Sequence, residues 1–309
     1  MKKITILLFA TAAIITACKK DITERNLQFP QLSPANPDSL AGTWKTFLVT
    51  DTTGFRIPAP GATNAAAYTR EINEIKSFQA NLTDDQRNRI QYWAAGSVLR
   101  WNEILRTLVA KHNLPPYQKE DGTYPAPSAA NPFAYPQFPF SNPPYAARAY
   151  AYVSAAQYDA LVTAYSYKNA DYYRRKAPYM IDSSVQVLVS KSTLGAYPAE
   201  SGVVSGVTVE ILKLLFPTEG AFIRQMADEE KLCSIISGGN VRSDVEAGET
   251  LGRLVAAKFA AKAASDRAGA AIGTPAIWAD LETKTAATGE TPWISLESPK
   301  RPPMLPLYG

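Results

Sequence analysis

Apolar residues recur at helical spacing over most of this 309-residue chain, whereas runs that alternate apolar and polar residues are few. Because one face of an α-helix returns every 3.6 residues and one face of a strand every two, this pattern favours helices. Thr83-Asp84-Asp85-Gln86 adds a capping box, in which the Thr hydroxyl and the Gln amide satisfy N–H groups at a helix start. We therefore predict an all-α helical bundle, with helices over about 70–80, 84–95, 97–112, 145–173, 202–216, 218–236 and 242–265. Thr218 is predicted to cap the helix that ends at Ile236.

Residues 113–144 are dense in proline, with Pro115-Pro116 near one end and Pro143-Pro144 at the other. Proline lacks an N–H and has a fixed φ, so this stretch is expected to be extended or turned. A linker between two domains would have this composition. We favour a long Pro/aromatic-rich loop packed on the helical body, because aromatic residues are interspersed in it: Tyr117, Tyr124, Phe133, Tyr135, Phe138 and Phe140.

Two other segments are expected to be irregular. Residues 38–68 contain Pro58, Pro60 and Gly61, and the tail from Gly269 contains several prolines and two tryptophans. We expect the tail to wrap the bundle, so that residues 38–309 form a single domain.

The N-terminus has the pattern of an export signal. A basic Met1-Lys2-Lys3 precedes an apolar run over 4–15, which is too short to span a bilayer, and small residues lead to Cys18. Ile15-Thr16-Ala17-Cys18 fits the lipobox that directs a lipid onto the cysteine sulfur, although an ordinary signal with a chance cysteine is the alternative. We predict a signal peptide at 1–17, lipidation at Cys18 and a tether over 18–37. The lipid would hold the domain on a membrane, the outer membrane of a Gram-negative bacterium.

Charge and the scarcity of certain residues exclude several functions. The formal net charge of +4 includes Lys2 and Lys3, which leave with the signal, so nucleic acid is not expected as a partner. Once Cys18 is acylated, the sequence offers Cys233 no second cysteine, so no disulfide is expected and Cys233 is predicted to be buried. His112 is the single histidine and no carboxylates are spaced around it as ligands, so no metal site is predicted.

Three segments in the second half share an order of polar residues with a known superfamily. Lys168 and Arg175 flank six residues, Tyr197–Gly206 contains Ser201-Gly202, and Cys233–Gly248 contains Ser234, Asn240 and Asp244. This order resembles the motifs Lys-x6-Arg-Pro, Pro-Ser-Gly-His and Ser-Arg-x5-His-x3-Asp of type 2 phosphatidic acid phosphatases and vanadium haloperoxidases. The resemblance covers roughly residues 70–260, and the phrase Arg242–Arg253 is especially similar to secreted bacterial members. It implies their helical bundle, with Lys168, Arg175, Ser201 and Gly202 as anion-binding residues.

This chain differs from the motifs at the positions that carry out the reaction in the family. The resemblance implies histidine at the places of Val203 and Asn240, the second of them four residues before Asp244. Valine transfers no proton, and the nitrogen of an amide is not a usable nucleophile. Arginine and proline of the motifs are replaced by Ser234 and Glu200, and Glu200 would place negative charge near a phosphate. We therefore assign no catalytic residue, although Val203, Asn240 and Asp244 occupy the positions equivalent to those of the family. No cofactor is predicted, and vanadate is relevant only if haloperoxidase activity survives.

The basic residues of the first motif, which this chain retains, have two interpretations. Lys168, Arg174 and Arg175 could form an anion pocket, or they could pair with Glu200 and Asp244 and fill a polar hole, which we favour. Asp228, Glu229 and Glu230 are interpreted as a solvated helix face. The sequence favours a non-catalytic exported lipoprotein that binds an anion or a protein partner. An active phosphatase or haloperoxidase with an atypical site is the alternative.

Overall fold

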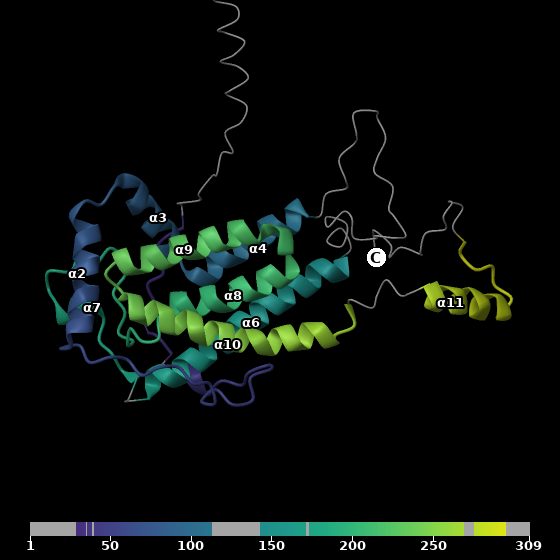
Figure 1. The fold of residues 1–309 in the computed structure, drawn as a ribbon, viewed down its shortest axis with the longest axis horizontal. Coiled ribbons are helices and arrows are strands. Elements are labelled where there is room, and N and C mark those ends of the chain that lie inside the picture. The colour runs from purple at the N-terminus through teal and green to yellow at the C-terminus, as the bar shows by residue number, and fades with distance from the viewer. Residues whose placement is uncertain are drawn as a thin grey trace, which may run out of the picture.

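The computed structural model describes residues 29–112 apart from 35 and 39, residues 143–268 apart from 171 and 172, and residues 275–294. These residues form helices and no strand, which confirms the all-α prediction (Figure 1). The α-helices are α2 (Ala66–Ala80), α3 (Asp84–Ala94), α4 (Ser97–Lys111), α6 (Pro143–Asn169), α7 (Pro178–Ile181), α8 (Glu200–Leu215), α9 (Gly220–Ile236), α10 (Arg242–Ser265) and α11 (Pro275–Ala287). Two short 3-10 helices, η1 (Ala41–Thr43) and η3 (Pro217–Glu219), complete the described elements.

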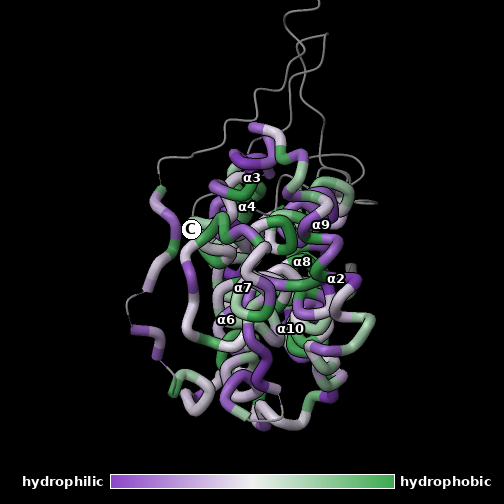
Figure 2. The backbone as a smooth tube through the Cα atoms, turned by 90° about the vertical axis from the view of Figure 1, so that its left-hand side faces the viewer, coloured by the Kyte–Doolittle hydropathy of each residue, from purple (hydrophilic) through white to green (hydrophobic). Residues whose placement is uncertain are grey.

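Helix α8 is the centre of the bundle. It contacts α4, α6, α9 and α10, and Figure 2, which looks along the bundle, shows these helices around it. Valine, isoleucine and leucine fill most of its buried positions, and burial of such apolar surface is the main stabilising contribution to a helical core. The buried apolar residues of α8 are Val203, Val204, Val207, Val209, Ile211 and Leu212.

Glycines allow α8 and α10 to approach until their backbones touch. A Cβ atom added to Gly252 would lie 2.3 Å from the carbonyl oxygen of Val203, and one added to Gly202 would lie 2.3 Å from that of Val245. Such distances are far inside van der Waals contact, so larger residues at these positions would force the two helices apart. Gly202 therefore has a packing role on the face of α8 toward α10.

The irregular segment that precedes α2 is held against α6 by a buried carboxylate. Asp159, which is fully buried, accepts hydrogen bonds from the backbone N–H groups of Phe47 and Leu48, each at 2.8 Å. Backbone groups outside regular structure need partners of this kind when water is excluded. The prediction that residues 38–68 are largely irregular is correct up to Ala65, apart from η1.

Several predicted helix boundaries agree with the structure and others do not. The capping box of Thr83 and Gln86 is present, and α10 covers the predicted residues. Helix α6 begins earlier than predicted, with Pro143 and Pro144 in its first turn. Proline is tolerated there because the first N–H groups of a helix have no acceptor within the helix.

Two predictions for the last third of the chain are wrong. Thr218 does not cap α9, because it belongs to η3 and the residue before α9 is Glu219. The tail is not wholly irregular, since α11 occupies part of it. The predicted signal peptide, Cys18 and the Pro/aromatic-rich loop up to residue 142 lie outside the described residues, so they stay predictions. Among the residues that are described, no helix combines the length and the apolar character needed to cross a bilayer.

Candidate functional site

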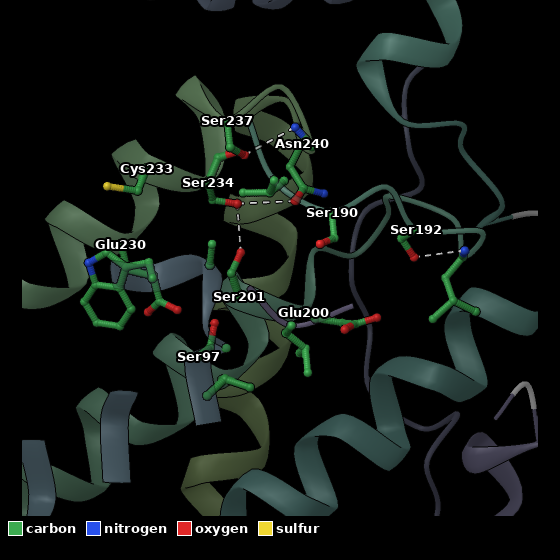
Figure 3. Close-up of a pocket in the computed structure, with 18 of the residues that line it drawn as sticks. Ser97, Ser190, Ser192, Glu200, Ser201, Glu230, Cys233, Ser234, Ser237 and Asn240 are labelled. Carbon is green, nitrogen blue, oxygen red and sulfur yellow. Dashed lines mark hydrogen bonds between the residues drawn. The ribbon is translucent and has the colours of Figure 1, made fainter. Parts of the chain in front are cut away.

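A cavity of about 810 Å³ lies beside the first turns of α8. Its walls come from α3, α4, α6, α9 and the segment between α7 and α8 (Figure 3). Apolar side chains such as Ile90, Trp93 and Val204 form part of the wall. The polar side chains include six serines, which are Ser97, Ser190, Ser192, Ser201, Ser234 and Ser237. A concave space of this size and mixed lining is typical of a small-molecule site.

Lys168 reaches this cavity from the end of α6, and the protein already satisfies its charge. Its Nζ donates to the carbonyl oxygen of Gly195 at 2.5 Å and lies 3.8 Å from Oε1 of Glu200. Burial lowers the pKa of Lys168, and the carboxylates of Glu200 and Asp244 act in the opposite direction. The ammonium group is therefore held between a carbonyl and a carboxylate, both supplied by the chain itself.

Arg175 and Asp244 form an ion pair that does not line the cavity. The guanidinium Nε donates to Oδ1 of Asp244 at 2.9 Å, and Nη2 donates to Asp244 and to the hydroxyl of Ser243. Asp244 also accepts from the backbone N–H of Val241 at 2.9 Å. Arg175 is 5% exposed and Asp244 is fully buried, so the pair is part of the protein interior.

Ser201, Ser234 and Asn240 form a short hydrogen-bonded chain along the cavity wall, drawn in Figure 3. The hydroxyls of Ser201 and Ser234 are 2.9 Å apart, and Ser234 donates to the amide oxygen of Asn240 at 3.3 Å. The amide nitrogen of Asn240 donates to the carbonyl oxygen of Ala196 at 3.0 Å. Both ends of the Asn240 side chain are thus occupied, and its conformation is fixed by the wall.

The structure brings some of the sequence-predicted residues together and leaves others apart. Lys168, Ser201 and Asn240 line the same cavity, with the Arg175–Asp244 pair in the interior. Gly202 and Val203 are not among the lining residues. Val203 is fully buried in the main apolar cluster, and Gly202 packs on the backbone of α10.

The interpretation of residues 228–230 as a solvated face is wrong for two of the three carboxylates. Asp228 is exposed, whereas Glu229 is 9% and Glu230 is 2% exposed. Glu229 accepts from Trp93 Nε1 at 3.0 Å and pairs with Arg89 at 3.1 Å. The three residues form one charged run in the sequence, but successive side chains of a helix point about 100° apart, so they can face different surroundings.

Glu230 is the lining residue that sequence reasoning missed. Its Oε2 accepts from the indole N–H of Trp101 at 2.6 Å, and Figure 3 shows its carboxylate on the side where Ser97 and Ser201 project. Burial raises the pKa of Glu230 to about 7, and nearby Ser97, Trp101 and Ser205 oppose this increase. Helical spacing could have revealed the site, because Glu230, Cys233 and Ser234 share one face of α9 and Ser237 follows at its C-cap.

Among the described residues, neither the single histidine nor a metal-binding cluster lines this cavity. The single histidine, His112, caps the C-terminal end of α4, where its Nε2 lies 2.8 Å from Glu219. Within the described parts of the chain, no group of three or more His, Cys, Asp or Glu side chains is placed to hold a metal ion. Cys233 is buried, as expected, and it contributes to the cavity wall.

The fold and the cavity together describe an all-α bundle with a mixed polar and apolar site beside its central helix. The chain matches no protein-family model and no curated protein. Its fold is similar to the crystal structure of a bacterial vanadium-dependent iodoperoxidase, with a TM-score of 0.54 and 16% sequence identity. The match covers 80% of this chain and 63% of that one, so the chain spans less than two thirds of the iodoperoxidase. The architecture is therefore that of a haloperoxidase-like helical bundle.

Proposed function

We propose that this chain is an exported bacterial lipoprotein whose haloperoxidase-like domain binds a small molecule without converting it. The lipid on Cys18 would hold the domain at the cell envelope, and the cavity beside α8 would take the ligand. Fold similarity supports the architecture, and the residues of the cavity support the absence of catalysis.

The observation that carries the proposal is the internal neutralisation of both cations. Lys168 is engaged by Gly195 and Glu200, and Arg175 by Asp244. Binding of an oxyanion gains most from cations that the protein leaves uncompensated, because the ligand then supplies the missing partner. Here the chain provides those partners itself.

The second support is the lack of a proton-transfer group and of a nucleophile at the places that the sequence motifs indicate. Asn240 holds its wall through two hydrogen bonds, and Val203 belongs to the apolar core. Losing a general acid alone typically costs about 10²–10⁴-fold in rate, and losing the covalent step removes more. A cavity of this kind can retain a ligand, since binding needs only complementary contacts.

The experiment on catalysis uses the purified mature protein. We expect no turnover of an aryl phosphate, and none of iodide or bromide with vanadate and peroxide. The threshold is about 1 s⁻¹, the low end of ordinary enzyme rates. Turnover above that rate which disappears in Lys168→Ala would overturn the proposal and favour an atypical phosphatase or haloperoxidase.

The experiment on binding measures thermal stability with a panel of small neutral, anionic and cationic compounds. A ligand that binds the folded state raises the melting temperature in proportion to its occupancy. Ser190→Trp, which fills part of the cavity, should abolish the increase. Ser265→Trp, on the exposed end of α10, is the matched control and should preserve it. If no compound raises the melting temperature, the binding proposal is wrong.

A further inference from the structure

Among the described residues, one carboxylate oxygen of a cavity-lining residue makes no hydrogen bond. Glu230 is 2% exposed, and its Oε2 accepts from Trp101. Within the described residues its Oε1 is buried and makes no hydrogen bond. The adjacent Glu229 is satisfied by Trp93 and Arg89, so the contrast is not a general property of this helix face. A buried polar atom that remains unpaired is costly, which makes Oε1 a place where a ligand atom would be stabilising.

The surroundings of Glu230 favour its neutral form. Within the described residues it makes no ion pair with a lysine or arginine, and the carboxylate of Glu249 on α10 adds negative charge nearby. The side chains of Ser97 and Trp101 from α4 and of Ser205 from α8 are uncharged hydrogen-bonding groups that lower its pKa, but burial has the larger effect. Burial raises its pKa to about 7, so a large share of the molecules carry the proton at neutral pH. With Oε2 accepting from the indole, the proton belongs on Oε1, which is then a buried donor without a hydrogen bond among the described residues.

The other polar groups of the cavity match an uncharged ligand rich in oxygen. Serine hydroxyls both donate and accept, and Ser97, Ser201 and Ser234 lie on the walls around Glu230. Lys168 is already neutralised by Glu200, so the cavity offers no spare positive charge to an anion. Trp93 and Val204 supply apolar surface of the sort that contacts the C–H face of a ring. The volume of about 810 Å³ accommodates a molecule of one or two sugar rings.

We propose that the cavity binds a small neutral polyhydroxylated molecule, a monosaccharide or polyol, with Oε1 of Glu230 donating a hydrogen bond to one of its oxygens. This inference rests on the proposed binding function and names the class of its ligand. Glu230 acts in it as a neutral donor, in the way that a carboxylic acid in an apolar site can act.

The experiment is calorimetric titration of the mature protein with glucose, galactose, mannose, xylose, N-acetylglucosamine, myo-inositol and glycerol. We expect at least one of these to bind. Glu230→Gln keeps a neutral donor at the same place and should change the affinity by less than about threefold. Glu230→Leu removes the donor and should weaken binding by about 10–100-fold, as expected for a buried hydrogen bond. Asp228→Asn is the matched control and should leave the affinity unchanged, because Asp228 is exposed and does not line the cavity.

The pH dependence supplies an independent criterion. If the protonated form binds, the affinity of the wild-type protein should fall as the pH rises through about 7, and that of Glu230→Gln should not. An affinity that rises with pH and is lost in both Glu230 variants would mean that the ionised carboxylate accepts a hydrogen bond from a ligand hydroxyl, and the inference would be wrong.

The outcomes also separate this inference from the proposed function. If no neutral compound binds but phosphate, sulfate or propylammonium binds in the same cavity, the polyol inference is wrong and the proposed binding function is retained. If no neutral, anionic or cationic compound binds, both the polyol inference and the proposed binding function are wrong. Equal affinity in wild type and Glu230→Leu, with an unchanged melting temperature, shows that Glu230 contributes nothing and overturns the inference alone.

Discussion

Replacing Arg175 by methionine tests whether the ion pair in the interior is structural. The substitution keeps most of the side-chain volume and leaves Asp244, which is fully buried, without its guanidinium partner. Breaking a buried pair by removing one member costs about 3–5 kcal/mol, because the remaining charge is uncompensated. A protein of this size changes its melting temperature by about 2–4 °C per kcal/mol, so we expect a decrease of about 6–20 °C.

The assay is thermal unfolding followed by circular dichroism, with a double variant as the control. Arg175→Met with Asp244→Leu removes both charges, and it should regain most of the lost stability, since apolar replacements of buried pairs are often neutral. A decrease below about 2 °C in the single variant, or a double variant less stable than the single one, would refute the reasoning. The first result would mean that Arg175 is available to a ligand after all.

The same variant predicts a pH dependence with a definite sign. Burial already raises the pKa of Asp244 in the intact protein, and Arg175 is the largest opposing influence. Without Arg175 the folded-state pKa rises further above the unfolded value, so the folded state binds more protons than the unfolded state. Stability then falls as the pH rises from the unfolded pKa through the folded pKa. The loss caused by Arg175→Met should therefore be smaller at pH 4 than at pH 7.

Two further predictions concern the packing of the bundle and the anchor. Gly252→Ala places a Cβ atom 2.3 Å from the carbonyl oxygen of Val203, and it should lower the melting temperature by about 4–8 °C. Gly220→Ala is its control, because the nearest atom would be 3.6 Å away in the Arg224 side chain, and the higher helix propensity of alanine should stabilise it by up to about 1 kcal/mol. Equal effects of the two substitutions would contradict the close approach of α8 and α10. For the anchor, Cys18→Ser should abolish incorporation of a labelled fatty acid in cells, and equal labelling of both proteins would exclude lipidation at Cys18.

Local sequence signals predicted much of the fold because their causes are local. The capping box at Thr83 and the extent of α10 depend on neighbouring residues and on helical spacing, and both are as expected. Helix α11 was missed because tryptophan and proline near it suggested an irregular tail. The role of Thr218 was also mistaken, because the chain makes a 3-10 turn before α9 begins, and no sequence pattern distinguishes such a turn from a cap.

The site was predicted less completely because it depends on contacts distant in sequence. The spacing of Lys168 and Arg175 places both near the start of α8, but it does not say that one faces a cavity and the other the interior. The burial of Glu230 requires α4 to supply Trp101 from 129 positions earlier in the chain. Charged residues are usually solvated, so a buried carboxylate contradicts the rule on which a single sequence has to rely.

The differences between this chain and the motifs it resembles are mutually compensating. Glu200 provides a carboxylate for Lys168, and Asn240 provides an amide that satisfies both Ser234 and the carbonyl of Ala196. Val203 adds apolar surface at a position where a buried polar ring would need a partner. Glu200 and Asn240 thus pair with groups of the chain itself, whereas the side chain of Val203 has no polar atom that needs a partner. Histidine placed at 203 and 240 alone would leave Lys168 beside Glu200 and Arg175 paired with Asp244. Packing alone does not require an open volume lined by six serines and a buried acid whose Oε1 makes no hydrogen bond among the described residues, so the cavity supports the proposed binding function.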